Sequence, residues 1–347
     1  MITRRLLATA LCTIALFACV ANVGAQELGG RAFGMGGAYV ANSDDIASLV
    51  YNPAGLPNSS FEVGIGLGSS DLGAITQFQS LLGDPSSFSG EASIDIATLS
   101  GVSIGGFGVG FAAQGSLAVS EGCAGFDLCG EGDYMTQIIL GYGRTNVAAP
   151  LKLFGLQAGF NVKRLDGRRI DFTKTHPAGG AYEIVTDNWT GQGYSLSLGA
   201  QLKASDIITL GFAANDVVSS LTWEGTRTSS TYLEANDELD HSSKTNLGQR
   251  SEQLDRVYRF GVAVKPPFLG VTLAADSGSD GSVRYGLEKD LLFGALKVRF
   301  GGIRSAGTAT TTAGLGVHLG PVRLDVAAGS TDGFQTVSTM IEGSVRF

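Results

Sequence analysis

Beyond its first 25 residues the chain has no run of 18 consecutive apolar residues, so we expect no membrane-spanning helix there. It also lacks a basic cluster, because 24 lysines and arginines stand against 32 acidic residues, giving a net charge of -8. A nucleic-acid partner is excluded because phosphate binding needs a basic surface. None of the three histidines has a serine and an acid arranged for catalysis or a second ligand at metal spacing. We therefore expect no enzyme, no metal site and no cofactor.

Cysteine is scarce as well, with four residues in 347, of which Cys12 and Cys19 lie near the N-terminus. Cys123 and Cys129 are six positions apart, and in an exported chain such a pair is typical of a disulfide that closes a loop. A metal site is the alternative, but two thiolates are too few ligands.

The N-terminus has the pattern of an export signal. Arg4 and Arg5 precede an apolar stretch over 6–20, and Val23-Gly24-Ala25 provides small residues for cleavage. We interpret residues 1–25 as a signal peptide. An uncleaved anchor is the alternative, and the shortness of the apolar stretch disfavours it.

The remaining chain is rich in glycine, with 51 residues, and alternates apolar with small or polar residues. This pattern is typical of strands that cross a membrane, which need roughly 9–11 residues each. The candidate strands are 61–69, 92–104, 107–120, 131–145, 151–166, 189–203, 206–223, 254–265, 268–277, 282–290, 294–304, 308–319, 320–329 and 336–347.

Long and short connections alternate between these strands. The long ones include 70–91, 121–130, 167–188 and 224–253, and turns such as Gly105-Gly106 and Ala204-Ser205 lie between them. The last strand alternates and ends on Phe347. We therefore predict an all-β fold, a 14-stranded antiparallel transmembrane β-barrel over 61–347. An even strand number places both termini on the periplasmic side of a bacterial outer membrane.

Charged residues in the second half of the chain fall on one face of each strand. A charge on the lipid face costs roughly 2–4 kcal/mol at the bilayer midplane, so these side chains should face the lumen. The predicted lumen charges are Arg284, Glu288, Lys297, Arg299, Arg323, Asp325, Glu342 and Arg346. Both signs interleave, which favours a mutually neutralising ladder over the alternative of a ring that selects ions.

Residues 26–60 do not have a strand pattern, and we interpret them as a short, partly helical N-terminal hatch in the lumen. Gly34, Gly36 and Gly37 allow a sharply turned backbone. Ser43 is a candidate N-cap, with Asp44 and Asp45 in the first helical turn. An ordinary capped helix of a soluble protein is the alternative at this level. The next residues are Asn52, a candidate cap, then Pro53 at a first helical position, Ala54 and Gly55.

The same segment carries a resemblance to a known family. Gly34-Met35-Gly36-Gly37-Ala38, the Asp44-Asp45 pair and Asn52-Pro53-Ala54-Gly55-Leu56 follow the signal in this order. Together they resemble the hatch of the FadL superfamily of outer-membrane barrels. The Gly-Met-Gly-Gly sequence is similar to the one found in the PorV-like branch of that superfamily. The resemblance implies that Asn52, Pro53 and Ala54 lie against an inward kink of the third strand, where a gap in the wall lets substrate pass sideways.

Two functions follow from this resemblance. The first is passive uptake of hydrophobic small molecules, such as long-chain fatty acids, with outer-membrane lipid and the hydrophobic ligand as partners. The second is a PorV-like role in secretion or surface attachment, with a protein of the secretion machinery as partner. No set of residues in the sequence identifies the ligand.

Overall fold

The computed structural model describes residues 28–58, 61–70, 90–123, 126–147, 155–176, 180–233, 238–305, 307–333 and 337–347. The expected signal peptide and most of the connection 70–91 lie outside these residues.

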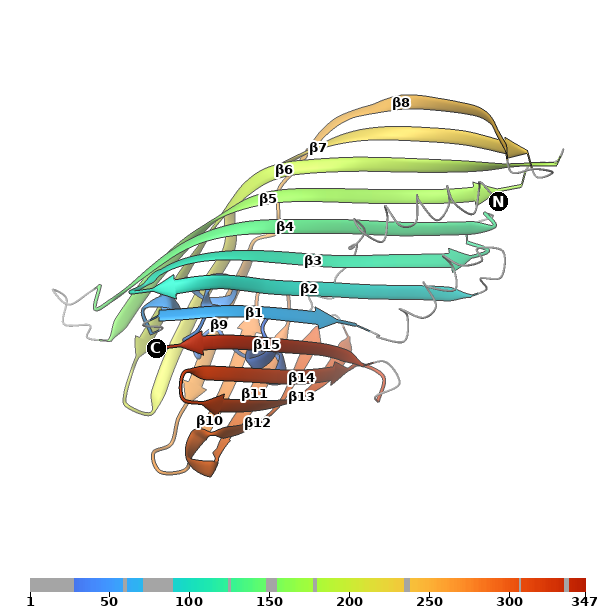
Figure 1. The fold of residues 1–347 in the computed structure, drawn as a ribbon. Coiled ribbons are helices and arrows are strands. Elements are labelled where there is room, and N and C mark those ends of the chain that lie inside the picture. The colour runs from blue at the N-terminus through green and yellow to red at the C-terminus, as the bar shows by residue number, and fades with distance from the viewer. Residues whose placement is uncertain are drawn as a thin grey trace.

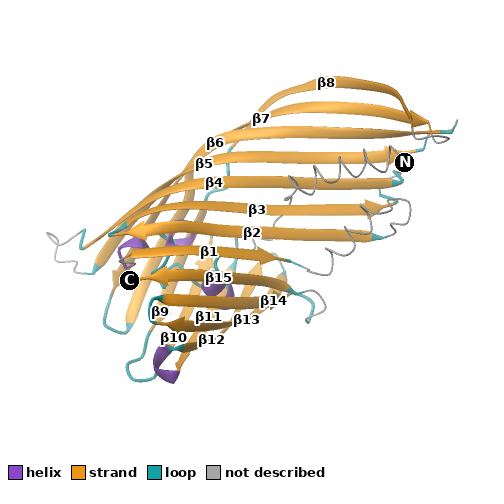
Figure 2. Ribbon diagram, in the orientation of Figure 1, coloured by secondary structure: helices purple, strands orange, loops and turns teal. Residues whose placement is uncertain are grey.

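The described residues form one antiparallel sheet of fifteen strands (Figures 1 and 2). The strands are β1 (Phe61–Ser69), β2 (Glu91–Ile104), β3 (Phe107–Glu121), β4 (Leu128–Thr145), β5 (Leu156–Thr175), β6 (Ala181–Lys203), β7 (Ile208–Leu233), β8 (Glu238–Glu252), β9 (Val257–Val264), β10 (Val271–Gly278), β11 (Val283–Leu291), β12 (Leu296–Ser305), β13 (Thr308–Leu319), β14 (Val322–Ser330) and β15 (Ser338–Arg346).

The sheet closes on itself because β1 pairs with β15 and β6 pairs with β7. The C-terminal part of β7, from Leu221 to Leu233, pairs with β8. Its N-terminal part, from Ile208 to Asn215, pairs with β9. Because β8 and β9 share one position in the wall, fifteen strands minus one give a barrel of fourteen, which confirms the predicted fold. We call the end where β1 begins and β15 ends the terminus end, and the opposite end the loop end.

The wall separates apolar from charged side chains as the alternation predicts. On β11, Val283 and Tyr285 are exposed, whereas Arg284 and Glu288 are buried. The exposed apolar side chains of neighbouring strands form a belt around the outside, as on β3, β9 and β14. A barrel wall with this belt is suited to contact with lipid.

The two halves of the barrel differ in height (Figure 1). Strands β9 to β12 have 8, 8, 9 and 10 residues, whereas β5, β6 and β7 have 20, 23 and 26. The prediction that 167–188 and 224–253 are loops was therefore wrong, because most of these residues continue the strands. The expected length of roughly 9–11 residues for a membrane-crossing strand was too short for these strands. Their backbone pairing continues past the apolar belt, where Asp166 and Gln192 make the outward face polar.

The described N-terminal segment, residues 28–58, contains α2 (Gly30–Gly34), α3 (Ser48–Tyr51) and the 3-10 helix η1 (Pro53–Asn58). Another 3-10 helix, η4 (Leu292–Gly294), lies in the turn between β11 and β12. No helix within the described ranges is long and apolar enough to cross a membrane.

Candidate functional site

The N-terminal segment is almost completely buried and packs against the inward faces of strands around the barrel, near the terminus end (Figure 1). The aromatic and aliphatic side chains of Tyr39, Leu49 and Leu56 are fully buried. A segment of about 30 residues therefore fills the part of the barrel where a water-filled pore would otherwise run, and its contacts define the candidate site.

Arg31 is the centre of the contacts with the short-strand half. Its Nε donates to Glu288 Oε2 on β11 at 3.0 Å, and its Nη1 donates to the Tyr39 hydroxyl at 2.9 Å and also to Asp44. Tyr39 in turn donates to Asp45. A buried arginine needs such partners, because removing one of them would leave an uncompensated charge at low dielectric. Arg31 therefore ties the segment to the wall.

The wall continues this network. Arg299 on β12 is fully buried, and its Nε donates to Glu288 Oε2 at 2.7 Å while its Nη1 donates to Asp325 on β14. His318 Nε2 lies 3.4 Å from the same Asp325 carboxylate. Charges of both signs are thus paired across strands that face the segment.

The other predicted lumen charges meet different partners. Glu342 accepts the Gly30 backbone N–H at 2.7 Å, and Arg346 donates to the Asn58 carbonyl. Lys297 pairs with Asp290, and Arg284 donates to Ser282. Arg323 keeps a buried Nε without a partner among the described residues. The eight residues thus lie on the same half of the barrel, and two of them contact the segment's backbone directly.

Sequence reasoning missed Asp276 on β10. Its Oδ2 accepts the backbone N–H groups of Tyr39 at 2.7 Å and Val40 at 2.9 Å. Asp276 is buried, and it lies on the lumen face of its strand by the same alternation that identified the other charges. Applying that alternation to 268–277 would have found it.

Asp44 and Asp45 are neighbours whose environments act in opposite directions. Burial would raise the pKa of Asp44, but the charges of Arg31, Lys265 and Arg346 outweigh it and hold the pKa below its usual range. For Asp45, burial and the adjacent Asp44 carboxylate outweigh Arg31 and raise the pKa. Asp44 therefore supplies the stabilised negative charge of the pair.

The long-strand half receives the segment through glycine. Gly143 on β4, Gly159 on β5 and Gly199 on β6 lie side by side in the register. A Cβ on Gly143 would lie 2.6 Å from the Pro53 carbonyl oxygen, and one on Gly159 or Gly199 would overlap the Asn52-Pro53-Ala54 backbone or the Asn52 side chain. We call this row of three glycines the track. Because glycine has no side chain, the backbone of Asn52 to Ala54 can lie directly against the strands there.

Leu49 and Leu56 fit beside the track. Their methyl groups would lie within 3.0 Å of a Cβ on Gly108 or Gly141, so these glycines on β3 and β4 make room for the leucines. Each fully buried leucine contributes roughly 1.5–3 kcal/mol by leaving water. The contacts of these two leucines are thus apolar.

The segment's backbone also meets polar side chains of this half. Asn161 on β5 donates to the Leu49 carbonyl at 2.6 Å, and Gln201 on β6 donates to the Val40 and Ser43 carbonyls at 3.1 Å. Asn52 donates to the Val40 carbonyl at 2.8 Å and to that of Ala200 at 3.1 Å. Sequence reasoning had no basis for selecting Asn161 or Gln201, because isolated amides on strands have no motif.

Local backbone structure of the segment differs in part from expectation. Asn52 accepts the Ala54 N–H at 3.1 Å, and Pro53 is the first residue of η1. Ser43 is not an N-cap; α3 begins at Ser48, and Asp45 accepts the Ala47 N–H at 3.0 Å instead. The prediction for Ser43 was wrong because its hydroxyl is engaged by Gln201 and the Asn52 carbonyl.

Gly34, Gly36, Gly37 and Gly55 lie at close approaches or turns. Gly36 and Gly37 have φ values of +63° and +67°, which side chains disfavour. A Cβ on Gly36 would overlap the backbone of Gly302, and one on Gly55 would overlap the Ser43 carbonyl. Gly34 lies against Gly314 on β13.

The expected kink in the third strand is not present. β3 pairs with β2 from Phe107 to Ser120 and with β4 from Phe107 to Glu121 without a register shift. Asn52, Pro53 and Ala54 lie against β4 to β6 instead. Register shifts of the described wall lie in β7 instead, one of them near Asp216, where Lys163 and Ser195 donate to the aspartate.

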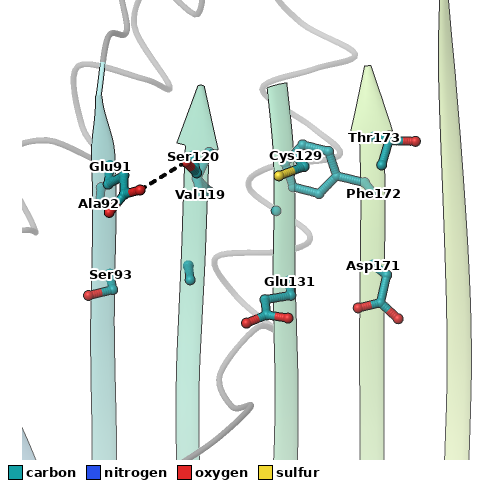
Figure 3. Close-up of a pocket in the computed structure, with 12 residues that line it drawn as sticks. Glu91, Ala92, Ser93, Val119, Ser120, Cys129, Glu131, Asp171, Phe172 and Thr173 are labelled. Carbon is teal, nitrogen blue, oxygen red and sulfur yellow. Dashed lines mark hydrogen bonds between the residues drawn. The ribbon is translucent and has the colours of Figure 1, made fainter. Parts of the chain in front are cut away.

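Cys123 and Cys129 form a disulfide with 6.2 Å between the Cα atoms, which confirms the pairing predicted from their spacing. It joins the ends of β3 and β4 at the loop end. A hollow of about 650 Å³ lies beside it, over β2 to β5 (Figure 3). Its lining is mixed, because the acidic residues Glu91, Glu131 and Asp171 lie beside the apolar Val119 and Phe172.

No group of three or more histidine, cysteine or acidic residues within the described ranges could hold a metal ion. Among the described residues, the N-terminal segment meets glycines on both halves of the barrel and charged side chains on β10 to β15, and neither arrangement offers a nucleophile with a base. The arrangement holds a segment of chain against the inner wall of the barrel.

Searches against models of protein families and against curated proteins find no match. Solved structures do match. The Ralstonia pickettii toluene transporter TbuX has a TM-score of 0.63 at 12% identity, covering 94% of this chain and 100% of that one. The P. putida toluene transporter TodX also has a TM-score of 0.63 at 12% identity, with 92% and 99% covered.

A Pseudomonas aeruginosa FadL homologue matches with a TM-score of 0.61 at 11% identity, over 95% of this chain and 100% of that one. The chain has the FadL-type barrel fold. This confirms the fold that the N-terminal motifs indicated. At such low identities the likeness shows the fold alone.

Proposed function

We propose that this chain is an outer-membrane channel for passive uptake of hydrophobic small molecules, with the N-terminal segment as its hatch. The observation that carries the proposal is the buried segment 28–58, which blocks a straight path through a barrel with an apolar outer belt. Similar structures are described as toluene transporters and a FadL homologue, which supports the same class of cargo.

The charges of the lumen support a hydrophobic cargo over an ion. Arg299 is bound to both Glu288 and Asp325, and Arg31 to Glu288 and Asp44, so the charges neutralise one another. Ion-selective pores instead present a ring of unpaired charges of one sign. In this proposal Gly34, Gly36, Gly37, Asp44, Asp45 and Asn52 to Gly55 form the gate, the termini are periplasmic, and long-chain fatty acids and monoaromatic hydrocarbons are the first cargoes to test.

The proposal is tested by locking the hatch. The Ile46 Cγ2 atom lies 3.2 Å from the position of a Cβ on Gly64, a spacing that suits a disulfide between Ile46→Cys and Gly64→Cys. With Cys123 and Cys129 both changed to serine, the locked barrel should lose uptake of labelled fatty acid or toluene into vesicles, and a reductant should restore it. The Gly64→Cys single variant is the control. Equal uptake by locked and reduced protein would refute the gate.

A secretion-related role is the second candidate. The observation in its favour is β8, which pairs with β7 alone among the described strands and is exposed along nearly all of its length. An exposed strand edge can pair with another polypeptide. Loss of protein export in a deletion strain, together with no uptake by the parent chain in vesicles, would favour this role over transport.

A further inference from the structure

Two turns at the terminus end carry bulky residues in an unfavourable backbone conformation. Phe268, between β9 and β10, has a φ of +68°, and Leu292 and Phe293, between β11 and β12, have φ values of +48° and +57°. The left-handed region disfavours side chains with a Cβ, and Gly, Asn and Asp are the usual occupants. The other non-glycine residues with positive φ in the described chain are Asn146 and Asp216, which follow that rule.

These strained side chains do not contribute to a core. Phe268 and Phe293 are fully exposed, and the adjacent Leu269 and Leu292 are exposed as well. A turn that is both strained and apolar, with its side chains in the open, gains nothing from packing within the chain. Strain that persists without internal compensation points to a role for the exposed side chains themselves.

The two turns form one surface. Strands β10 and β11 are paired, the Asp290 N–H donates to the Gly270 carbonyl at 2.7 Å, and Lys289 Nζ donates to the Leu269 carbonyl. We call Phe268, Leu269, Leu292 and Phe293 the Phe-tip patch. The patch is held in place by these bonds, and it is continuous with the exposed apolar belt through Leu291 and Leu273.

The strands that carry the patch are short. β9 and β10 have 8 residues each, and at 3.3 Å per residue and a tilt of about 40° they rise only about 20 Å. The apolar band of an outer-membrane barrel is about 25 Å tall, so these strands leave part of it uncovered. Apolar side chains on the turns fill that difference, and the Lys289 ammonium beside them suits a phosphate-bearing headgroup.

We propose that the Phe-tip patch inserts into the lipid leaflet at the terminus end and anchors the short-strand half of the barrel. The occupant is therefore lipid at the boundary between acyl chains and headgroups. This inference rests on the proposed outer-membrane function, because it needs the barrel to be in a bilayer.

The position of the patch is measured with Phe293→Trp in vesicles of brominated phosphatidylcholine. Trp189 and Trp223 lie on the part of β6 and β7 that extends past the belt, so they contribute a background that lipid does not quench. We expect the introduced indole of Phe293→Trp to be quenched at least twofold, most strongly by bromines near the headgroup end of the acyl chain. Thr245→Trp on exposed β8 is the matched control, and its introduced indole should not be quenched.

Quenching of the Phe293→Trp protein no greater than that of the Thr245→Trp protein, in a barrel that migrates as a heat-modifiable band, would overturn the inference and favour a protein partner at this end. Failure of the parent chain to insert would overturn the proposed function with it. A second variant separates strain from insertion. Phe293→Gly should raise the denaturation midpoint in detergent by relieving strain, yet slow insertion into vesicles at least threefold; unchanged insertion would contradict the anchor.

Discussion

The two halves of the barrel hold the N-terminal segment by different sets of contacts. On β10 to β15 charged side chains contact the segment, with Arg31, Glu288 and Asp276 at their centre, and glycines there also approach its backbone. On β3 to β6 the wall offers glycines to Leu49 and Pro53, and uncharged amide side chains bind the segment's backbone. The desolvation cost of a buried ion pair offsets much of its Coulomb attraction, so its net contribution to stability is small. Removing one partner is nevertheless costly, because the other charge stays buried and unpaired. The β10 to β15 half therefore adds fixed charged contacts to the apolar burial that both halves provide.

The glycine side should be the more sensitive of the two to a single substitution. Gly159→Val places a side chain where the Pro53 backbone lies, so the clash is with backbone atoms of the N-terminal segment and not with a flexible side chain. Overpacking ordinarily costs about 1–3 kcal/mol, and a backbone clash exceeds that, so we expect the segment to leave its site altogether. Limited proteolysis should cleave within 28–58 while the barrel still migrates as a folded band.

Gly343→Val on β15 is the control for this variant, because a Cβ there meets nothing within 4 Å. It should leave the protease pattern unchanged. Protection of residues 28–58 in the Gly159→Val protein would show that the track does not hold the segment.

On the charged side, Arg31→Met should have the next largest effect. It removes one cation from three carboxylates and leaves Asp44 and Asp45 buried without it, which costs about 3–5 kcal/mol. Hydrogen exchange at the Tyr39 and Val40 amides should then accelerate, because those amides donate to Asp276. Adding Asp45→Asn should recover part of the loss, because Asp45 is the buried carboxylate that Arg31→Met leaves without a cation, whereas Glu288 keeps Arg299; a purely additive double variant would contradict the network.

The Leu49→Ala variant tests the apolar retention. Leu49 is completely buried among lumen glycines that cannot fill the space it leaves, so we expect a loss of about 2–5 kcal/mol. The effect should be confined to exchange at residues around α3 and η1. An equal acceleration at Tyr39 and Val40 would show that the two sides act as one unit.

Much of this architecture was readable from the sequence, and the reasons are physical. Alternation identified most strands to within a few residues because lipid and lumen impose a strict period of two, as in Phe107-Gly108-Val109-Gly110-Phe111. That same stretch also contained the glycine side of the site, since apolar residues alternate with glycines that face the hatch. The sequence of a strand alone does not reveal what lies against its glycines.

The extended parts of β5 to β8 could not be predicted in this way. Towards the loop end polar residues occupy the strands, so Arg227 and Asp187 can pair across strands without any apolar alternation to mark them. The position of Asn52 to Ala54 was beyond the sequence for another reason. Glycines occur on β3 as well as on β4 to β6, and only the three-dimensional register shows that Gly143, Gly159 and Gly199 align.

The smallest expected effect separates two adjacent carboxylates, through Asp44→Asn and Asp45→Asn. Docking lowers the pKa of Asp44, so its contribution is present above its unfolded value of about 3.9 and is lost as the pH falls through the lowered folded value. Docking raises the pKa of Asp45, so its contribution has the opposite sign and is lost as the pH rises. At neutral pH, Asp44→Asn should therefore cost about 1.5 kcal/mol of docking free energy.

Asp45→Asn should cost less. An amide oxygen still accepts the Ala47 N–H, and the negative charge that the substitution removes is one that docking disfavours. Hydrogen exchange of peptides from 28–45, measured at pH 7, gives both values with each variant as the other's control. Each substitution removes one unit of negative charge within two adjacent residues, so a difference between them reports the local environment rather than net charge. Equal losses would mean that Arg31 does not distinguish the two carboxylates, and the charged side would then act as a diffuse field instead of a set of fixed pairs.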